Sequence, residues 1–283
     1  METFDNVALV WATDDNYALP AAVSGRSLLA NLPDTVRPTM YVLDLGISPR
    51  SRDLIAASWS SAASVEFLPL DEALLRDLPS TRCENREFAP TVFAYLLVPG
   101  MLSGRHRRML YLDADTLVVG DARPLADLPL GEHAFGAVHD WDFGAEAQVF
   151  GQQHAGRQLN AGVLAIDVER WEALDATRRV FDFARGRTDL MLPDQDSLNV
   201  ALGGHWQELS YEWNFQVART VVREHRGPLP RILHYGGARK PWLGRSALPH
   251  FFRLYQGYAR MTAFDTTAMP ARAYPGWWED DGR

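Results

Sequence analysis

The residues best suited to chemistry are Asp113 and Asp115, two acids that stand one residue apart. They follow residues 107–112, a short and mostly apolar run that predicts a buried strand. Because residues i and i+2 of an extended chain point to the same side, both carboxylates face one way. Mg²⁺ is usually held by one or two carboxylates together with phosphate oxygens. The pattern therefore predicts a metal–diphosphate site, and the alternative is a pair of acids that ends a strand and caps a turn.

Residues 234–242 form a second segment that brings a histidine, two adjacent glycines and a lysine together. His234 is a candidate third metal ligand. The glycines, Gly236 and Gly237, permit a ligand to approach the backbone closely. Lys240 is the single lysine among 28 basic residues, and its compact ammonium suits a phosphate group. Taken alone, a histidine that ends a strand is more often packed, and two glycines more often form a turn.

The N-terminal part of the chain alternates between strand and helix patterns. Apolar runs and helical spacing predict, in order, strand 7–12, helix 17–31, strand 40–43, helix 48–60 and strand 65–68. This alternation indicates the α/β class, with a mostly parallel sheet covered by helices on both faces. Ligands bind such sheets beyond the carboxyl ends of the strands. Asp14 and Asn16 follow the first strand, so we expect them to face the same crevice as Asp113 and Asp115.

The remaining elements follow from the same patterns. We expect helices at 90–102, 169–185, 197–202 and 248–262, and strands at 134–138, 160–167, 206–209 and 232–237. Residues 141–157 have few periodic apolar positions and are expected to form an active-site loop. Residues 1–246 are assigned to one catalytic domain, and residues 247–283 to a helix and tail that pack on it. Trp277 and Trp278 are expected to take part in that packing.

Composition excludes several classes of protein. The net charge is -8 and no basic stripe is present, so we expect no nucleic-acid partner. Cys83 is the one cysteine, which rules out a disulfide framework or a thiolate zinc site. The acidic N-terminus does not resemble a signal peptide, and no apolar run has the roughly 18–20 residues of a transmembrane segment. We therefore expect a cytoplasmic protein.

Other metal and nucleotide motifs fail at particular positions. An EF-hand loop needs an oxygen ligand and a glycine where Leu117 and Val118 stand. A dinucleotide-binding fold needs a glycine-rich first turn, but residues 13–16 are Thr-Asp-Asp-Asn. No Walker loop is present. An acidic first turn suits a base or ribose hydroxyls better than a bare phosphate.

Five motifs that are weak alone occur together in a specific order. They are residues 12–17 (Ala-Thr-Asp-Asp-Asn-Tyr), 111–115 (Tyr-Leu-Asp-Ala-Asp), 160–162 (Asn-Ala-Gly), 194–196 (Asp-Gln-Asp) and 234–242 (His-Tyr-Gly-Gly-Ala-Arg-Lys-Pro-Trp). Through them, residues 7–243 resemble the family-8 glycosyltransferases, which include glycogenin and the bacterial lipopolysaccharide galactosyl- and glucosyltransferases. The resemblance implies a single-domain GT-A fold, a UDP-hexose donor, Mn²⁺ with Mg²⁺ as the alternative, and transfer with retention of anomeric configuration.

The resemblance also implies a role for each matching residue. Metal ligands would be Asp113, Asp115 and His234. Contacts to the nucleotide would come from Ala12, Thr13, Asp14, Asn16 and Ala114, and contacts to the diphosphate from Gly237 and Lys240. The donor sugar would be surrounded by Asp140, Asn160, Ala161, Asp194 and Gln195. Partners would be the UDP-sugar donor and a glycan, lipid-linked or small-molecule acceptor.

The mechanism follows from the residue placed nearest the anomeric carbon. By the resemblance, that residue would be Gln195, whose amide is a poor nucleophile. We therefore favour a front-face mechanism, in which the leaving phosphate accepts the acceptor's proton. Asp140 and Asp196 are the candidates for a covalent route of the kind that retaining glycosidases use.

One position departs from the family pattern. Relatives carry an arginine in a Tyr-x-Arg-Leu segment, where this chain has Tyr95. Tyrosine can stack or donate a hydrogen bond but offers no cation. A nucleotide-sugar-binding protein with little transfer activity is therefore the rival hypothesis. A nucleotidyltransferase is a second rival, against which the absence of a glycine-rich basic first turn argues.

Overall fold

The central sheet of the molecule has seven strands in the order β10-β8-β9-β6-β1-β2-β3. A computed structural model describes Phe4 and residues 6–83, 86–140, 158–217, 230–237, 240–244 and 249–270. The strands are β1 (Val7–Thr13), β2 (Thr39–Asp44), β3 (Ser64–Pro69), β6 (Arg108–Leu112), β8 (Phe135–His139), β9 (Leu159–Asp167) and β10 (Trp206–Leu209). Neighbouring strands are parallel except where β9 runs antiparallel to β6 and β8. This arrangement confirms the expected mostly parallel α/β sheet.

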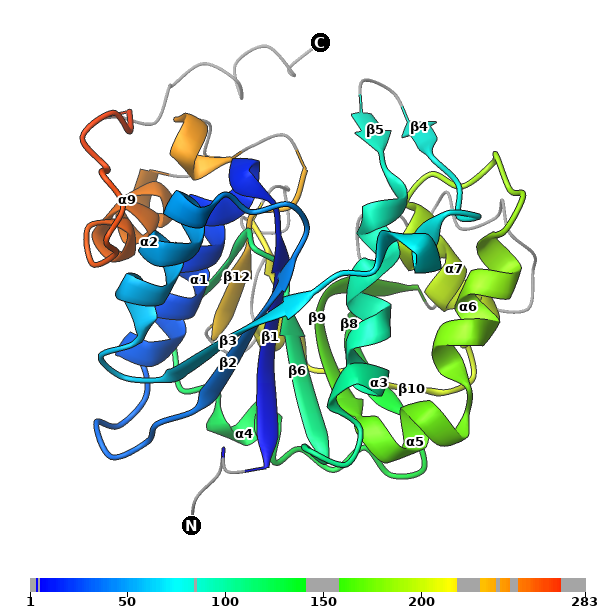
Figure 1. Cartoon of the computed structure of the whole chain (residues 1–283). Coiled ribbons are helices and arrows are strands. Elements are labelled where there is room, and N and C mark those ends of the chain that lie inside the picture. The colour runs from blue at the N-terminus through cyan, green and yellow to red at the C-terminus, as the bar shows by residue number, and fades with distance from the viewer. Residues whose placement is uncertain are drawn as a thin grey trace, which may run out of the picture.

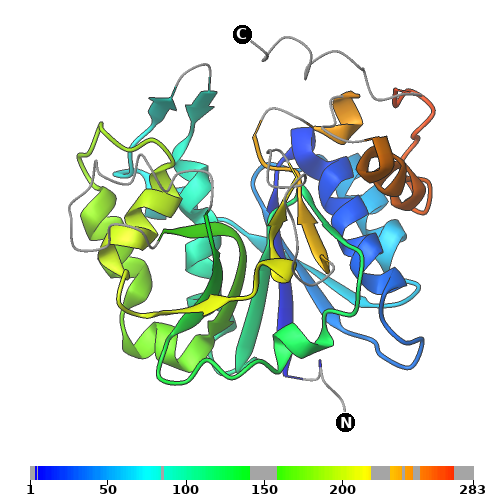
Figure 2. The ribbon, with the colours of Figure 1, turned by 180° about the vertical axis from the view of Figure 1, so that it is seen from behind.

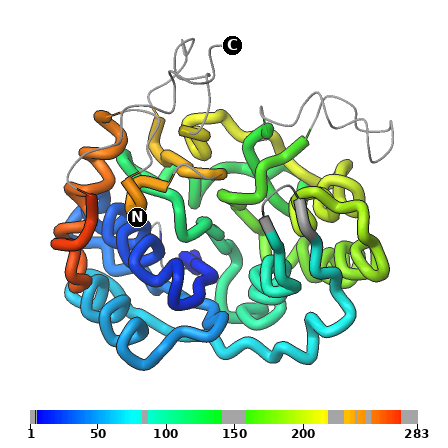
Figure 3. Tube along the Cα trace, turned by 90° about the horizontal axis from the view of Figure 1, so that it is seen from above, coloured from blue at the N-terminus to red at the C-terminus, as the bar shows by residue number. Residues whose placement is uncertain are grey.

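Helices cover both faces of the sheet because its strands are apolar on both sides. In β1, Leu9 and Trp11 face α1 (Ala18–Ala30) and α2 (Pro49–Trp59), whereas Ala8 and Val10 face the opposite layer. That second layer consists of the 3₁₀ helix η3 (Pro90–Leu97), α3 (Val98–Leu102), α5 (Val168–Ala173), α6 (Ala176–Ala184) and α7 (Pro193–Ala201). The two groups of helices flank the sheet in Figure 1, and Figure 3 shows the path of the same chain from above.

A smaller sheet lies beside the central one and brings the C-terminal part of the chain to it (Figure 2). It contains β11 (Phe215–Gln216), β12 (Ile232–His234) and β7 (Thr116–Val118), and β12 pairs antiparallel with β7. On this sheet packs α9 (Pro249–Ala259), through Phe251 and Tyr255, which belong to the same buried cluster as Val23 of α1. The register places His234 opposite Thr116, directly after the Asp113–Asp115 turn.

Several short elements complete the described chain. They are η1 (Asp15–Tyr17), η2 (Glu72–Leu75), the hairpin strands β4 (Thr81–Cys83) and β5 (Arg86–Phe88), α4 (Arg123–Ala126), η6 (Tyr211–Trp213) and η7 (Pro241–Leu243). Among the described residues, no helix has the length and apolar character needed to cross a membrane.

Three local predictions need correction. The expected helix 90–102 is a 3₁₀ helix up to Leu97 and α-helical only over Val98–Leu102. The expected helix 169–185 is split, because Asp175 adopts a left-handed backbone conformation with φ of 53° between α5 and α6. The helix expected over 197–202, with residues 193–196 as its opening, is α-helical from Pro193 to Ala201, and the fixed φ of Pro193 suits a first helical turn.

Some expectations remain predictions. The expected active-site loop 141–157 lies outside the described residues, as do Trp277 and Trp278. The boundary between residues 246 and 247 also stays a prediction, although α9 does pack on the rest of the molecule.

We predict that Gly25 of α1 is required for the contact between α1 and α2. A Cβ at Gly25 would lie 2.4 Å from the ring of Trp59, and that ring is held because its Nε1–H donates to the Ala22 carbonyl at 2.9 Å. The Gly25→Ala variant should therefore lose roughly 1–3 kcal/mol of unfolding free energy, measured by urea denaturation. Gly257 of α9 has nothing within 4 Å of a built Cβ, so Gly257→Ala is the matched control. The control should gain about 0.5–1 kcal/mol, and equal gains in both variants would contradict the prediction.

Candidate active site

Three side chains able to bind a metal converge at the end of β6. The possible ligand atoms of Asp113, Asp115 and His234 all lie within 4.8 Å of one another. His234 Nε2 is 3.2 Å from Asp115 Oδ1 and 3.6 Å from Asp113 Oδ2. Asp115 and His234 are buried, whereas Asp113 keeps 37% of its side chain exposed to the cleft. The structure thus brings together residues that are about 120 positions apart in the chain.

Backbone hydrogen bonds hold the two acids in place. The Asp113 N–H donates to the Gly162 carbonyl of β9 at 2.8 Å, and the Thr116 N–H closes a turn to the Asp113 carbonyl at 3.0 Å. The Tyr235 N–H donates to the Asp115 carbonyl at 2.9 Å, which joins the acidic turn to the end of β12. The turn is therefore fixed by the two strands that carry the other site residues.

Lys240 supplies the positive charge next to this cluster. Its Nζ forms an ion pair with Asp115 Oδ2 and donates to the Tyr235 carbonyl at 2.9 Å. The residue is 8% exposed, and its ammonium lies 5.6 Å and 5.5 Å from the ring centres of Tyr17 and Trp242. These contacts pair the ammonium with a carboxylate and a carbonyl oxygen, as a buried charge requires.

The charges of the cluster shift one another's pKa values. Burial would raise the pKa of Asp115, but the charges and hydrogen bonds of Lys240 and His234 together outweigh it and hold that pKa well below its usual range. Burial would lower the pKa of Lys240 and of His234, but Asp115, together with the charge of Asp113, outweighs burial, so both pKa values are raised. For Asp113, enclosure and then the charge of Asp115 raise the pKa. The result is a site in which Asp115 and Lys240 are both ionised.

The residues present fit a divalent cation. Two carboxylates and one imidazole form a donor set that first-row divalent metals accept. Gly162 leaves the space that this arrangement needs, because a Cβ there would lie 2.3 Å from His234 Cε1 and 3.0 Å from Asp113 Oδ2. Glycine at this position is thus a steric condition for the approach of His234 to Asp113.

The cleft next to the three side chains holds the residues expected to contact a nucleotide. It has a volume of about 320 Å³ and is lined by Ala12, Thr13, Asp14, Tyr17, Leu45, Thr91, Asp113, Ala114 and Asp115. Asp14 caps η1 by accepting from the Tyr17 N–H at 3.0 Å, and Asn16 Nδ2 donates to the same carboxylate at 2.9 Å. Gly237 has a φ of 73°, a conformation that favours glycine.

The residues expected to surround the sugar form one hydrogen-bonded network. Asn160 Nδ2 and Gln195 Nε2 both donate to Asp140 Oδ2, at 3.1 Å and 2.8 Å. The Ala161 N–H donates to Gln195 Oε1 at 3.1 Å. Four of the five expected residues are therefore in direct contact, although they come from β9, α7 and the end of β8.

Asp194 and Asp196 point to different partners. Asp194 Oδ2 accepts from the Tyr95 hydroxyl at 3.0 Å, and burial raises the pKa of Asp194 to about 6. Asp196 Oδ2 instead accepts from the N–H groups of Met191 and Leu192, at 2.7 Å and 2.9 Å. Asp196 therefore binds the segment before α7, outside the network around Gln195.

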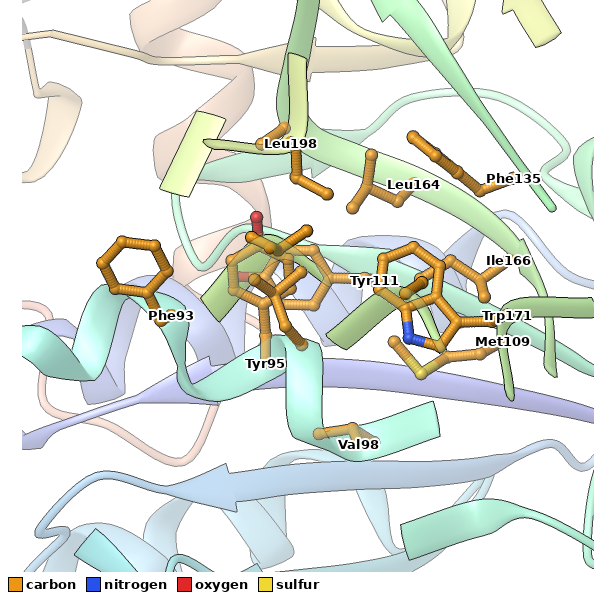
Figure 4. Close-up of a cluster of buried hydrophobic side chains, with 14 of the residues drawn as sticks. Phe93, Tyr95, Val98, Met109, Tyr111, Phe135, Leu164, Ile166, Trp171 and Leu198 are labelled. Carbon is orange, nitrogen blue, oxygen red and sulfur yellow. The ribbon is translucent and has the colours of Figure 1, made fainter. Parts of the chain in front are cut away.

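Tyr95 both stacks and donates a hydrogen bond, which are the two interactions a tyrosine can offer in place of arginine. Its ring lies parallel to that of Tyr111, with centres 4.2 Å apart and an angle of 11° (Figure 4). The Tyr111 hydroxyl donates to Asp113 Oδ1 at 2.7 Å. The stacked pair thus connects Asp194 to Asp113 without a charged side chain.

Three contributors were missed at the sequence level: Asn214, Tyr111 and the steric role of Gly162. Asn214 Oδ1 lies 2.9 Å from His234 Nδ1, and Asn214 is 1% exposed. An asparagine between Trp213 and Phe215 is the one signal that the sequence offered, since a buried amide needs partners. Nothing in the spacing indicated that His234 would be one of those partners.

Comparison with known proteins extends over most of the chain. The sequence model of the family described as Glycosyl transferase family 8 matches residues 8–246. General stress protein A of Bacillus subtilis (strain 168) is 28% identical over 281 residues, covering 93% of this chain and 96% of that protein. A lipopolysaccharide 1,2-glucosyltransferase of Escherichia coli (strain K12) is 23% identical, over 86% of this chain and 74% of that protein.

Solved structures share the fold. The bifunctional glycosyltransferase WbbM has a TM-score of 0.73 at 18% identity, and the match covers 94% of this chain but only 50% of WbbM. An active-site mutant of LgtC has a TM-score of 0.72 at 24% identity, covering 93% of this chain and 98% of LgtC. These likenesses show the GT-A fold expected from the motifs. The family match runs from the first strand to beyond Lys240 and includes every residue of the site, so the chain belongs to glycosyl transferase family 8.

Proposed function

We propose that this glycosyltransferase moves galactose or glucose from a UDP-sugar to an acceptor hydroxyl, with Mn²⁺ and with retention of configuration. The observation that carries the proposal is the cluster of Asp113, Asp115 and His234, with Lys240 beside it, at the end of a cleft lined by Ala12–Asp14. Among relatives, one is named a lipopolysaccharide 1,2-glucosyltransferase, and LgtC is described as a galactosyltransferase in complex with donor and acceptor sugar analogs. These names support a hexose as the transferred group.

In the proposed site, three side chains bind the metal ion and a fourth supplies a fixed positive charge. Asp113, Asp115 and His234 would hold the ion, and the histidine nitrogen favours Mn²⁺ over Mg²⁺, which is bound mainly through oxygens. When bound, the cation supplies positive charge that stabilises the diphosphate as it leaves. Lys240 is already ionised and held in place by Asp115, so it offers the diphosphate a second positive charge without reorganisation. Gly237 would let the backbone approach the same group.

The remaining expected residues would bind the rest of the donor. Nucleotide contacts are assigned to Ala12, Thr13, Asp14, Asn16 and Ala114, and sugar contacts to Asp140, Asn160, Ala161, Asp194 and Gln195. The first set lies in and beside the cleft, and the second lies around the start of β9. A donor that reaches from one set to the other would place its diphosphate between them, at the metal ligands.

The hydrogen bonds of the sugar side support a front-face mechanism. Gln195 accepts from the Ala161 N–H through its oxygen and donates to Asp140 through its nitrogen, so both atoms of this poorly nucleophilic amide are engaged in hydrogen bonds. The acceptor oxygen would bond to the anomeric carbon on the face from which the phosphate oxygen departs. The acceptor's proton passes to that phosphate oxygen. Asp140 and Asp196 stay the candidates for a covalent route.

A nucleotide-sugar-binding protein with little transfer activity is the second candidate function. The observation behind it is Tyr95, which gives Asp194 a neutral partner where relatives would have a cation. The acceptor would be a glycan, a lipid-linked sugar or a small molecule in the first case, and no acceptor is needed in the second.

A donor assay separates the two functions. We expect UDP to bind at least tenfold more tightly with Mn²⁺ than without it by calorimetry, and UDP release from UDP-galactose or UDP-glucose to require Mn²⁺. Asp115→Asn should reduce that release by about 10²-fold or more, because it weakens the metal site and the partner of Lys240 together. Metal-dependent UDP binding without turnover over a broad acceptor panel would favour the binding protein. Full activity of Asp115→Asn would reject the site.

We predict that a methyl group added at Gly162 weakens Mn²⁺ binding, whereas one added at Gly236 does not. Gly162→Ala should weaken Mn²⁺ binding by about 10–100-fold, because its Cβ would displace His234. At Gly236, a Cβ would lie 3.6 Å from His234 Nε2, which is ordinary contact, so Gly236→Ala should change the affinity less than threefold. Electron paramagnetic resonance of free Mn²⁺ measures both affinities. Equal affinities in the two variants would show that His234 is not a ligand.

We predict different effects on UDP release for substitutions of the two candidate nucleophiles, Asp140 and Asp196. Asp140→Asn removes a carboxylate from the Gln195 network and should lower UDP release by about 10²-fold. Asp196→Asn should lower it less than tenfold and mainly cost stability, about the 0.5–2 kcal/mol of a lost helix cap, because Asp196 accepts from two backbone N–H groups just before α7. Initial rates and urea denaturation give the two values. The reverse ranking of rates would point to a covalent route through Asp196.

A further inference from the structure

A continuous chain of side-chain hydrogen bonds joins the metal-binding histidine to the amide at the reaction centre. From His234 Nδ1 it passes to Asn214 Oδ1 at 2.9 Å, and from Asn214 Nδ2 to Asn160 Oδ1 at 2.7 Å. Asn160 Nδ2 donates to Asp140 Oδ2 at 3.1 Å, and Gln195 Nε2 donates to the same oxygen at 2.8 Å. Every link lies within normal hydrogen-bond distance.

Two consecutive backbone N–H groups of β9 fix the direction of this chain. The Gly162 N–H points at the Asn160 side chain at 3.0 Å, so the atom it meets must be the amide oxygen. The Ala161 N–H points at the Gln195 side chain at 3.1 Å, so that atom must be an oxygen as well. A backbone N–H can only donate, and these orientations therefore do not depend on how the amide groups are assigned.

The orientation of Asn160 determines the state of His234. Asn160 presents its oxygen to Asn214, so Asn214 must donate its NH₂ and turn its own oxygen to His234. That oxygen carries no hydrogen, and His234 Nδ1 must therefore donate. The neutral ring then keeps its lone pair on Nε2, the atom that faces Asp113 and Asp115.

We infer that Asn214 is a positioning residue that selects the Nε2-binding tautomer of His234 and connects the metal site to the donor-sugar network. The inference rests on the proposed function, because it assigns His234 to the metal. Asn214 is buried, as are its neighbours Trp213 and Phe215, and its two hydrogen bonds fix the orientation of its amide. No hydrogen bond among the described residues joins Asn214 to Asp113 or Asp115, so Asn214 acts on the metal site through His234.

Two substitutions separate the two bonds of Asn214. Asn214→Ala removes both, and Mn²⁺ affinity should fall by about 10–100-fold. Asn214→Asp keeps an acceptor for His234 Nδ1 but loses the donor to Asn160. Its Mn²⁺ affinity should stay within about threefold of wild type, while kcat for UDP release falls at least tenfold with little change in KM for the donor. Paramagnetic resonance of Mn²⁺, without donor, gives the affinities.

A structural control accompanies these variants. Asn31 donates to the carbonyls of Ser27 and Val118 and to the Tyr258 hydroxyl, away from the site. Asn31→Ala should lower thermal stability and leave Mn²⁺ affinity unchanged. This result would show that the loss of a partly buried amide does not by itself weaken Mn²⁺ binding.

The outcomes distinguish this inference from the proposed function. If wild type binds Mn²⁺ and turns over donor while Asn214→Ala binds Mn²⁺ equally well, the positioning role is wrong and the function stands. If Asn214→Asp loses as much affinity as Asn214→Ala, acceptance from His234 is not what Asn214 contributes. If folded wild type binds no Mn²⁺, both the metal-dependent function and this inference are overturned. Circular dichroism shows which variants are folded.

Discussion

The site depends on neutralising two carboxylates that the chain places one residue apart. Asp113 and Asp115 repel each other, and burial makes charge more costly to hold. The balancing groups, His234 and Lys240, come from the C-terminal part of the chain, and the pairing of β12 with β7 delivers them. The small sheet is thus an electrostatic requirement of the acidic turn as well as an element of the fold. Without this pairing, Asp115 would lose the cation that keeps it ionised.

The reversed strand β9 solves a geometric problem for the same site. In a parallel sheet only the carboxyl ends of strands reach the ligand edge. Because β9 runs antiparallel to β6, its first residues lie at that edge, and Leu112 pairs with Val163. Asn160, Ala161 and Gly162 therefore stand beside Asp113. Three consecutive residues provide an amide side chain, two directed N–H groups and the space that His234 occupies.

The elements with strong apolar patterns and the residues of the ordered motifs could be predicted from the sequence. The strands around Val10 and Leu110 were predictable because each is buried on both faces. The break at Asp175 was not, since it depends on a left-handed residue that no apolar spacing reveals. Asn214 escaped for a related reason. Its role lies in contacts with His234 and Asn160, at positions 20 and 54 residues away, which only the folded chain brings together.

The two buried carboxylates on either side of Asp113 are treated in opposite ways. Asp115 is paired with Lys240 and stays ionised, whereas Asp194 accepts from the Tyr95 hydroxyl and from backbone N–H groups, and burial raises its pKa to about 6. One half of the site is therefore organised around paired charges, and in the other half the carboxylates are held by uncharged donors. A nucleotide sugar has the same division, since its diphosphate is charged and its sugar presents hydroxyls. The stacked rings of Tyr95 and Tyr111 lie between the two halves. They link Asp194 to Asp113 through stacking and hydrogen bonds, and neither ring carries a charge.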